Sequence, residues 1–439
     1  MQSGFVEKLP AIVGAPNVLT GIDLSPYVVE GRTPAAAVFP GSVDEVRAVV
    51  TLAAEAGVPL IPWGGGTAAT VGIPPAHTGV VLGLRRLARI VEHEPGDLTV
   101  TAEAGITLAE LQAALRAKRQ WLSLDPPEAA RATVGGIVAA NAAGPRRHLY
   151  GTARDLLIGI TVITGDGSLV RGGGKVVKNV AGYDVPKLFV GSYGTLGIIV
   201  AATLKLRPVA EDERLVATRF DRIKDAAAAV RALLAGDLVP NAVVLLDGEA
   251  SRAVGMTDGA PTLVVGFDGL TEQVEWQSTQ TRDLGASFGG RATAALAPAA
   301  WSALADAARA AAATPAAVMR FSVLPTLVGE TMEQGAGAGR QRGLHTAWAA
   351  DAGVGGVTAA VFSGEGHQDP AALAALLGEW REMAHAGGGH ATLEWAPLAV
   401  KELVPVWDDL GAAARIMRGI KLQLDPRQIL NPGRFAGGI

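Results

Sequence analysis

The 439-residue chain contains no cysteine. It therefore has no disulfide bond, no zinc–thiolate site and no cysteine-ligated iron–sulfur cluster of its own. Any chemistry that needs such a cluster as an electron relay must find it in another polypeptide. The missing cysteines do not indicate a compartment, because a cysteine-free protein folds under reducing and oxidising conditions alike.

The chain also lacks an excess of basic charge and a long apolar run. Its formal net charge is -4, which gives no indication of a nucleic-acid partner. Apolar stretches such as Leu196–Leu204 fall well short of the roughly 20 residues that span a bilayer. The first residues, MQSGFVEKLPAIVGAPNVL, have no basic start followed by an apolar core, so we expect no signal peptide. We expect a cytoplasmic protein without a transmembrane segment.

The chain has enough hydrophobic residues and enough length for more than one hydrophobic core. The hydrophobic fraction is 49%, and the chain exceeds the roughly 250–300 residues at which one core stops growing. Near Pro208 the pattern changes to strands that alternate with alanine-rich helices, while Gly335–Gly343 is predicted to be a loop. We predict an α+β protein with a first domain at 1–207, a second at 208–412 and a C-terminal segment at 413–439.

A first glycine-rich segment follows a predicted β–α–β unit. Ser42 and Glu45 form a capping box for a helix that ends at Gly57, and a short buried strand then runs into Pro62-Trp63-Gly64-Gly65-Gly66-Thr67. Successive glycines expose backbone N–H groups that can wrap a pyrophosphate. An ordinary turn between strands is the alternative.

Two familiar phosphate motifs do not fit this chain. The dinucleotide fingerprint needs a helix and a later acidic residue, but Gly72-Ile73-Pro74-Pro75 blocks the helix and Leu84-Arg85-Arg86 stands where the acid should be. A P-loop fails because Gly174-Lys175 is followed by Val176.

A second segment, residues 132–144, is small and nearly uncharged. Such a stretch lets a large flat ligand approach the backbone closely. Positive charge follows at Arg146, Arg147 and His148, and then Arg154-Asp155. Glycine and alanine enrichment without function is the alternative.

Together these motifs resemble the FAD-linked oxidase family of the vanillyl-alcohol-oxidase type over roughly residues 30–208 and the tail. Gly191-Ser192-Tyr193-Gly194-Thr195-Leu196-Gly197-Ile198-Ile199 and Ile429-Leu430-Asn431-Pro432-Gly433 complete the pattern. The resemblance implies a two-subdomain FAD-binding domain, an α+β cap domain and non-covalently bound FAD. It implies that the FAD-binding residues are Pro62, Trp63, Gly64, Gly65, Gly66, Thr67, Gly135, Gly136, Ala139, Asn141, Ala143, Gly144, Gly151, Arg154, Asp155, Tyr183, Gly197, Ile198, Ile199 and Asn431.

A narrower resemblance comes from Ala143-Gly144-Pro145-Arg146-Arg147, Gly151-Thr152-Ala153-Arg154-Asp155 and residues 177–184, VKNVAGYD. These look like the FAD-binding E subunits of bacterial glycolate oxidases. The resemblance implies oxidation of a 2-hydroxy acid by hydride transfer to the flavin, with a second flavin subunit and an iron–sulfur subunit as partners. Such partners would also be the route to a membrane. The alternatives are an accessory FAD-binding subunit without substrate chemistry, or a stand-alone FAD oxidase of another alcohol or hydroxy acid.

The chain departs from relatives that carry a divalent metal. They have a His-x-x-Gly-Asp-Gly-Asn-x-His stretch and a Glu-His pair, whereas this chain has only Phe362-Ser363-Gly364-Glu365-Gly366-His367. We therefore predict no metal. No histidine lies in residues 62–72, so covalent histidyl–flavin attachment is not supported.

The reaction needs a cation for the carboxylate and a base for the hydroxyl proton. Arg146, Arg147, Arg320 and Arg434 are candidates for the cation, since arginine binds carboxylates in bidentate fashion. His367 and His148 are candidates for the base. Lys178, Asn179 and Tyr183 belong to the motif at residues 177–184. We expect them to line the flavin ring or a subunit contact, and a loop that ties two subdomains together is the alternative. The predicted catalytic residues are His367, Arg146, Arg434 and Lys178, and a surface or structural role is the alternative for each.

Overall fold

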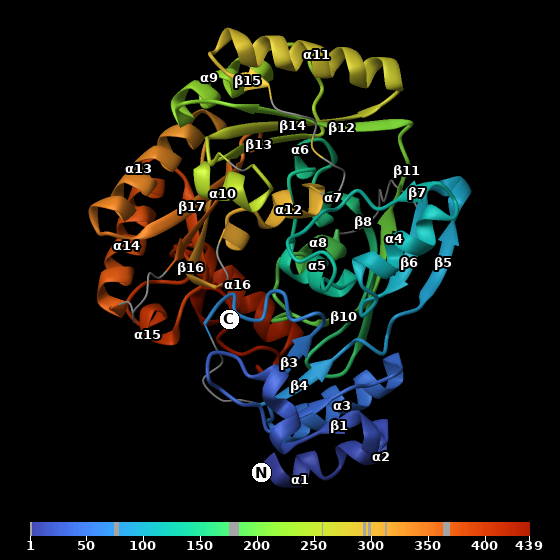
Figure 1. Ribbon diagram of the computed structural model, residues 1–439. Helices are drawn as coiled ribbons and strands as arrows, with labels where there is room; N and C mark the ends of the chain where they lie inside the picture. Colours follow the sequence, from blue (N-terminus) through green and yellow to red (C-terminus); the bar gives the residue numbers. More distant parts are fainter. Residues whose placement is uncertain are drawn as a thin grey trace. The chain divides into compact units, whose positions relative to one another are not determined.

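The computed structural model describes residues 2–73, 79–174, 184–256, 258–292, 296, 300–311, 314–362 and 369–439 (Figure 1). The chain divides into two compact units that are each assembled from separate segments. Unit 1 comprises Met1–Ala142, Thr152–Val209 and Asp409–Ile439, and unit 2 comprises Ala143–Gly151 and Ala210–Asp408. Residues 143–151, which the sequence analysis placed in the first domain, thus pack with the second unit.

Unit 1 begins with a four-stranded sheet in the order β1-β2-β4-β3, in which β2, β4 and β3 are parallel. The strands are β1 (Val18–Leu19), β2 (Ala36–Val38), β3 (Leu60–Trp63) and β4 (Val80–Gly83). Helix α3 (Val43–Ala56) connects β2 to β3, begins at Ser42, whose side chain accepts from the Glu45 N–H, and ends at Gly57 with φ +64°. The predicted β–α–β unit is confirmed, and β3 leads directly into the glycine loop.

A second, antiparallel sheet of unit 1 has the order β5-β6-β10-β8-β9. Its strands are β5 (Ile90–Glu94), β6 (Thr99–Glu103), β8 (Leu157–Ile163), β9 (Leu169–Gly173) and β10 (Ile198–Lys205). Helices α4 (Leu108–Arg116) and α5 (Val134–Ala140) pack on it and share one apolar core with its buried side chains. Residues 132–144 therefore contain a short helix, whose small side chains let it pack closely: a Cβ on Gly135 would lie 2.6 Å from the Ala104 Cβ.

Unit 2 is built on an eight-stranded antiparallel sheet in the order β15-β12-β14-β13-β17-β18-β16-β19. Its strands are β12 (Asp212–Arg219), β13 (Ala242–Leu246), β14 (Thr262–Gly269), β15 (Arg291–Ala292), β16 (Pro315–Ser322), β17 (His345–Asp351), β18 (Gly356–Phe362) and β19 (His390–Trp395).

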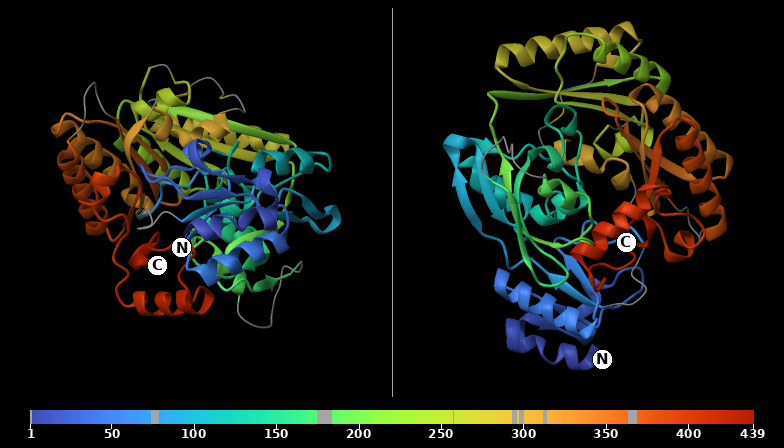
Figure 2. Two further views of the ribbon diagram at one scale, coloured as in Figure 1. Left: turned by 90° about the horizontal axis from the view of Figure 1, so that it is seen from below. Right: turned by 180° about the vertical axis from the view of Figure 1, so that it is seen from behind.

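Four long helices cover one face of this sheet. They are α9 (Ile223–Leu234), α11 (Thr271–Ser287), α13 (Val328–Gln341) and α14 (Pro370–Ala386), and they share the largest core with the strands (Figures 1 and 2). Side chains of the opposite face pack against α10 (Gly248–Ala253) and α12 (Ala300–Asp306). The α+β prediction for this part of the chain is confirmed.

The prediction of a loop at Gly335–Gly343 is wrong, because most of this stretch is the second half of α13. Glycine is needed there for packing rather than for a turn. A Cβ on Gly335 would lie 2.1 Å from Trp348 Cη2, and one on Gly339 would lie 2.7 Å from Thr346 Cγ2. The missing side chains let α13 approach β17 closely enough to bury Trp348 completely. Strands β17 and β19 were likewise not predicted.

We expect opposite stability effects from alanine at two glycines of α13. Gly335→Ala should destabilise unit 2 by about 1–3 kcal/mol, because its methyl group must displace Trp348, which is packed on Phe321 and Trp380. Gly337→Ala meets only the end of Arg340 at 3.9 Å, so it should gain up to about 1 kcal/mol of helix propensity. Urea unfolding of both variants checks this, and equal stabilisation by both would contradict the packing role of Gly335.

Candidate cofactor site

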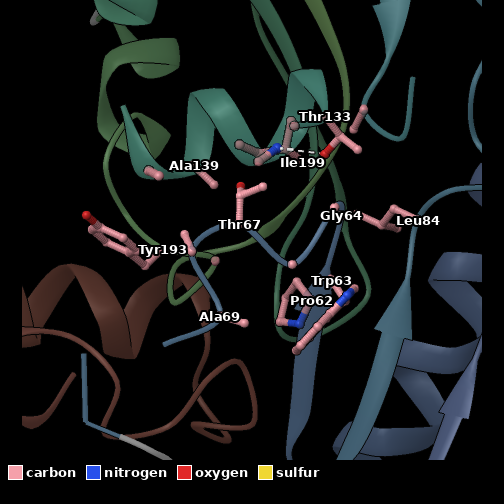
Figure 3. A pocket seen from close by; sticks show the side chains of 18 of the residues that line it. Pro62, Trp63, Gly64, Thr67, Ala69, Leu84, Thr133, Ala139, Tyr193 and Ile199 are labelled. Carbon is pink, nitrogen blue, oxygen red and sulfur yellow. Dashed lines mark hydrogen bonds between the residues drawn. The ribbon is translucent and has the colours of Figure 1, made fainter. Parts of the chain in front are cut away.

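A cavity of unit 1 lies where the glycine loop after β3 meets α5 and the C-terminal segment. Figure 3 shows Gly64 and Thr67 on this loop, facing the helix that carries Ala139. The cavity is lined by residues 61–69, Leu84, Ala104, Thr133, Gly135, Gly136, Ala139, Ala140, Tyr193, Gly194, Gly197, Ile199, Asn431 and Arg434. Segments that are far apart in sequence thus form its wall.

The glycine loop packs without side chains against the segment before α5. A Cβ on Gly64 would lie 2.2 Å from Thr133 Oγ1, and one on Gly65 would lie 1.9 Å from the Arg131 carbonyl oxygen. The Arg131 Nη2 donates to the Gly65 carbonyl at 3.0 Å, which fixes the loop from the other side. Gly66 has φ +75°, a conformation that favours glycine. Glycine is therefore favoured at all three positions of the loop, 64, 65 and 66.

The C-terminal segment contributes a buried amide to the wall. Asn431 is 5% exposed, and its Nδ2 donates to the Tyr193 carbonyl at 2.7 Å. Its Oδ1 is buried without a hydrogen-bond partner among the described residues. A buried acceptor of this kind costs free energy unless a ligand or water donates to it. Asn431 therefore marks a polar contact point for a ligand.

The same segment contributes a buried cation. Arg434 is 3% exposed and donates to the Ala69 carbonyl on the glycine loop. Burial lowers the pKa of Arg434 to about 10, while Glu30 and Tyr193 oppose this. The group stays protonated at neutral pH and supplies positive charge to the cavity.

These residues fit a flavin nucleotide. Backbone N–H groups of the glycine loop can hold a diphosphate, and Arg434 adds charge of the required sign. The small and apolar side chains, Ala104, Ala139 and Ile199 among them, leave room for a flat ring system. The unpartnered Asn431 Oδ1 can accept a hydrogen bond from a ring or ribose group.

Two protein families match most of the chain. The FAD binding domain family matches residues 34–173, and the family of FAD linked oxidases, C-terminal domain, matches residues 209–435. The chain belongs to the FAD-linked oxidases. FAD is thus the cofactor of this chain.

Relatives of this FAD-linked oxidase include glycolate oxidase subunits. It is 34% identical to glycolate oxidase subunit GlcD of Bacillus subtilis over 249 residues, which are 55% of this chain and 53% of the relative. It is 43% identical to glycolate oxidase subunit GlcE of Escherichia coli over 151 residues, which are 34% of this chain and 43% of the relative. The chain thus spans about half the length of the curated relatives it matches.

Among solved structures, substrate-bound p-cresol methylhydroxylase matches 100% of this FAD-linked oxidase and 96% of its own chain. The TM-score is 0.79 and the sequence identity is 19%. At this identity the likeness concerns the fold, and it confirms the predicted vanillyl-alcohol-oxidase type of architecture.

The structure brings many of the residues predicted to bind FAD into the cavity. These are Pro62, Trp63, Gly64, Gly65, Gly66, Thr67, Gly135, Gly136, Ala139, Gly197, Ile199 and Asn431. Arg434, predicted as catalytic, also lines it. Leu84, Ala104, Thr133 and Ala140 also line this wall but were not predicted to do so. Of these only Thr133 carried a signal, as the residue that caps α5 through the Gly136 N–H at 3.3 Å.

Other predicted FAD-binding residues of unit 1 do not line the cavity. Asn141 ends α5 with φ +47°, and its Oδ1 accepts from the Arg154 N–H at 3.2 Å. Asp155 accepts from the Thr152 N–H at 2.8 Å as a helix cap. Ile198 is fully buried in an apolar core. Arg154 likewise makes a local contact, since it donates to the Lys187 carbonyl at 3.4 Å. The contact of these four residues with FAD stays a prediction.

The remaining predictions fall in unit 2 or outside the described residues. Ala143, Gly144 and Gly151 belong to unit 2, as does Arg146, whose guanidinium pairs with Glu213 at 2.7 Å and stacks on Trp301 at 4.0 Å. Tyr183, Lys178 and His367 lie outside the described residues.

Unit 2 carries a cluster of charges around the carboxylates of Asp351 and Glu394. Arg309 pairs with Glu394, and Arg320 Nη1 lies 3.8 Å from Glu394 Oε1. Arg147 lies on α6 (Arg147–Tyr150). Together with Arg320 and Arg309 it stabilises the charged form of the Asp351 carboxylate through electrostatic attraction. We call these five residues the arginine cluster; it contains three positive and two acidic groups.

The two carboxylates of the arginine cluster titrate differently. Burial raises the pKa of Asp351 to about 6, although the three arginines oppose this. At Glu394 burial acts in the same direction, but Arg309 and Arg320 outweigh it and hold the pKa below its usual value. Asp351 is therefore the carboxylate of the cluster whose pKa lies close enough to neutral pH for it to exchange a proton.

His148 lies beside this cluster. A Cβ on Gly353, two residues after Asp351, would lie 2.2 Å from His148 Nδ1. Burial lowers the pKa of His148, so the ring is neutral at pH 7. The Nδ1 atom is buried and has no hydrogen-bond partner among the described residues.

Two further findings concern the described residues alone. No three histidine, cysteine or acidic side chains among them come together in a way that could hold a metal ion. None of their helices has the length and apolar character needed to cross a membrane.

Proposed function

We propose that this FAD-linked oxidase oxidises a small 2-hydroxy acid, such as glycolate, to the 2-oxo acid, as the FAD-binding subunit of a glycolate oxidase-like complex. The observation that carries this proposal is the arginine cluster of unit 2, which places three guanidinium groups around a carboxylate able to take a proton. The glycolate oxidase subunits among the relatives support the choice of substrate class.

The guanidinium groups of the cluster suit a substrate monocarboxylate. Arg309 and Arg320 both lie near the carboxylate of Glu394. A substrate carboxylate can bind in bidentate fashion to a guanidinium of this group. Arg320, whose side chain is 33% exposed and whose contact with Glu394 is 3.8 Å long, is the residue we assign to this contact.

Asp351 is the group to which we assign the hydroxyl proton. It lies on β17, and Arg320 on β16 acts on its charge, so both belong to the same cluster. A pKa of about 6 keeps the group deprotonated at pH 7 but close to the operating pH, which is the condition for efficient general-base catalysis. His148, with its free Nδ1, is the competing candidate.

The oxidation needs one acceptor for a hydride and one for a proton. The α-carbon loses a hydride and the hydroxyl group loses a proton, which leaves the C=O bond of the 2-oxo acid. FAD supplies the two-electron acceptor for the hydride. Asp351 takes the proton and releases it to solvent, and Arg320 keeps the carboxylate in place throughout.

We also propose that a second flavin subunit and an iron–sulfur subunit receive the electrons. The glycolate oxidase subunits among the relatives support a complex of several subunits. The chain itself has no cysteine and holds no cysteine-ligated iron–sulfur cluster, which is compatible with this division.

An absorbance spectrum of the purified chain, repeated anaerobically with glycolate and with D-lactate, tests the proposed function. We expect a flavin band that bleaches with a 2-hydroxy acid. A flavin band that persists with both acids, while dithionite bleaches it, would contradict the substrate proposal and favour an accessory FAD-binding subunit.

A further inference from the structure

We propose that Lys421 and Asp425 form a buried latch that positions the C-terminal segment, and with it Asn431 and Arg434, in the FAD cavity. The two residues are positioning residues and do not line the cavity themselves. This inference concerns the cofactor site alone and does not depend on the substrate proposed above.

Lys421 lies on helix α16 (Ala413–Leu424) and is the one residue of this helix that is buried, with a side-chain exposure of 4%. Its Nζ donates to the Thr195 carbonyl at 2.7 Å, to Asp425 Oδ2 at 2.6 Å and to the Leu430 carbonyl at 2.9 Å. An ammonium group has three N–H donors, and all three are used here. Burial lowers the pKa of Lys421, while Asp425 opposes this.

Asp425 completes the network from the other side. Its side chain is fully buried and accepts from the Ile429 N–H at 3.1 Å and from the Leu430 N–H at 2.8 Å, in addition to Lys421. Gly165, in the turn between β8 and β9, packs so closely that a Cβ there would lie 2.2 Å from Asp425 Oδ1. The pair is thus satisfied in every direction, as a buried ion pair must be to persist.

The residues that the latch holds are next to the cavity wall. Leu430 bridges to Leu60 of β3, and the Asn431 N–H donates to the Leu60 carbonyl at 2.9 Å. Thr195 lies between Gly194 and Gly197, which both line the cavity. The latch therefore ties the C-terminal segment to the strand before the glycine loop and to the loop of Tyr193.

Two strained residues show why such a tie is needed. Tyr193 has φ +51° and Asn431 has φ +42°, both in the left-handed region, where a residue other than glycine is strained. They line the cavity and are joined by the hydrogen bond from Asn431 Nδ2 to the Tyr193 carbonyl. Strained conformations persist only where neighbouring contacts fix them. Lys421 binds Thr195 and Leu430, each within two residues of a strained residue.

The test compares FAD affinity with stability. Lys421→Met removes the donors but would leave the Asp425 charge buried, so Lys421→Met is combined with Asp425→Asn to remove both charges. We expect the double variant to bind FAD about 10- to 100-fold more weakly, within the range of coupling seen between residues of one network. Arg415→Met, at an exposed position of the same helix, is the matched control and should bind FAD as the wild type does. If the double variant does not fold, Lys421→Gln, which retains two donors, takes its place.

A cycle with Asn431→Ala separates positioning from general destabilisation. If the latch acts through Asn431, its removal should weaken FAD binding much less in the Asn431→Ala background than in the wild type. FAD titration by flavin fluorescence and thermal unfolding of the apoprotein are measured for each variant. Unchanged FAD affinity in the double variant, or effects of the two changes that multiply independently, would overturn the proposal.

Discussion

Gly65→Ala is expected to weaken FAD binding by about 100-fold or more and to yield a colourless protein after purification. The Cβ of alanine would lie 1.9 Å from the Arg131 carbonyl oxygen, and contacts under 3.0 Å are essentially never seen, so the loop must shift by more than 1 Å. The obstacle is backbone that adjoins the capped start of α5, so it cannot rotate away as a flexible side chain would. A misplacement of about 1 Å can cost an enzyme about 100-fold in rate, and we expect a loss of similar size in FAD affinity when the backbone ligands of the loop move.

The size of this effect follows from how the loop binds its ligand. Its contacts with a diphosphate come from backbone N–H groups, and these move with the backbone. The shift would also break the hydrogen bond from Arg131 Nη2 to the Gly65 carbonyl and carry the neighbouring Gly64 away from Thr133. A side-chain ligand could compensate by choosing another rotamer, but a backbone ligand has no such freedom.

Gly96→Ala is the control for the Gly65 variant. Gly96 lies in a short 3₁₀ turn, and a Cβ there would meet nothing within 4 Å. We expect this variant to bind FAD normally and to unfold as the wild type does. The ratio of the absorbance near 450 nm to that at 280 nm and the FAD dissociation constant are the two readouts. A yellow Gly65→Ala protein with wild-type FAD affinity would show that the loop does not bind the cofactor in this way.

Much of the cofactor site could be predicted because its residues carry local signals. Gly64–Gly66 follow a buried strand, and the capping residue Ser42 marks a helix start that the structure reproduces. These features depend on neighbours within a few positions of the chain. Asn431 was also predicted, through the resemblance of the C-terminal segment to a known family.

What could not be predicted depends on contacts between distant segments. Gly335 is indistinguishable in sequence from a loop glycine, and only Trp348 on the facing strand explains it. In the sequence, Lys421 and Asp425 look like an ordinary i, i+4 pair at the end of a helix. Only the structure shows that the Thr195 and Leu430 carbonyls accept from Lys421. Asp351 had no local signal either, because its environment is made by arginines that lie far from it in sequence.

The arginine cluster leads to the second large effect. Asp351→Asn should lower kcat for the 2-hydroxy acid by about 100- to 10,000-fold, the range for loss of a general base, with little change in FAD content. In the wild type, kcat/KM should fall as the pH drops through about 6, because burial raises the pKa of Asp351 to that value and only the deprotonated carboxylate accepts a proton. The variant should lack this acid limb.

The pH at which the acid limb lies distinguishes Asp351 from the charged groups around it. The groups that face it are Arg147 and His148 of α6, Arg309, Arg320 of β16 and, through these arginines, Glu394 of β19. The arginines keep their charge across the range, and Glu394 has its pKa held below its usual value, so neither produces a limb near pH 6. Burial lowers the pKa of His148, so a limb from this group would lie below the ordinary histidine range and would vanish in His148→Gln.

Three variants together assign the roles within the cluster. If Asp351 is the base, Asp351→Asn loses the acid limb, His148→Gln retains it, and Arg320→Met mainly raises KM because it removes a contact made equally in the ground state and the transition state. Flavin reduction by the substrate, followed anaerobically in a stopped-flow instrument, measures the step directly. A full rate of reduction in Asp351→Asn at pH 7.5, with loss of activity in His148→Gln, would transfer the role to the histidine and leave Asp351 as a structural partner of the three arginines.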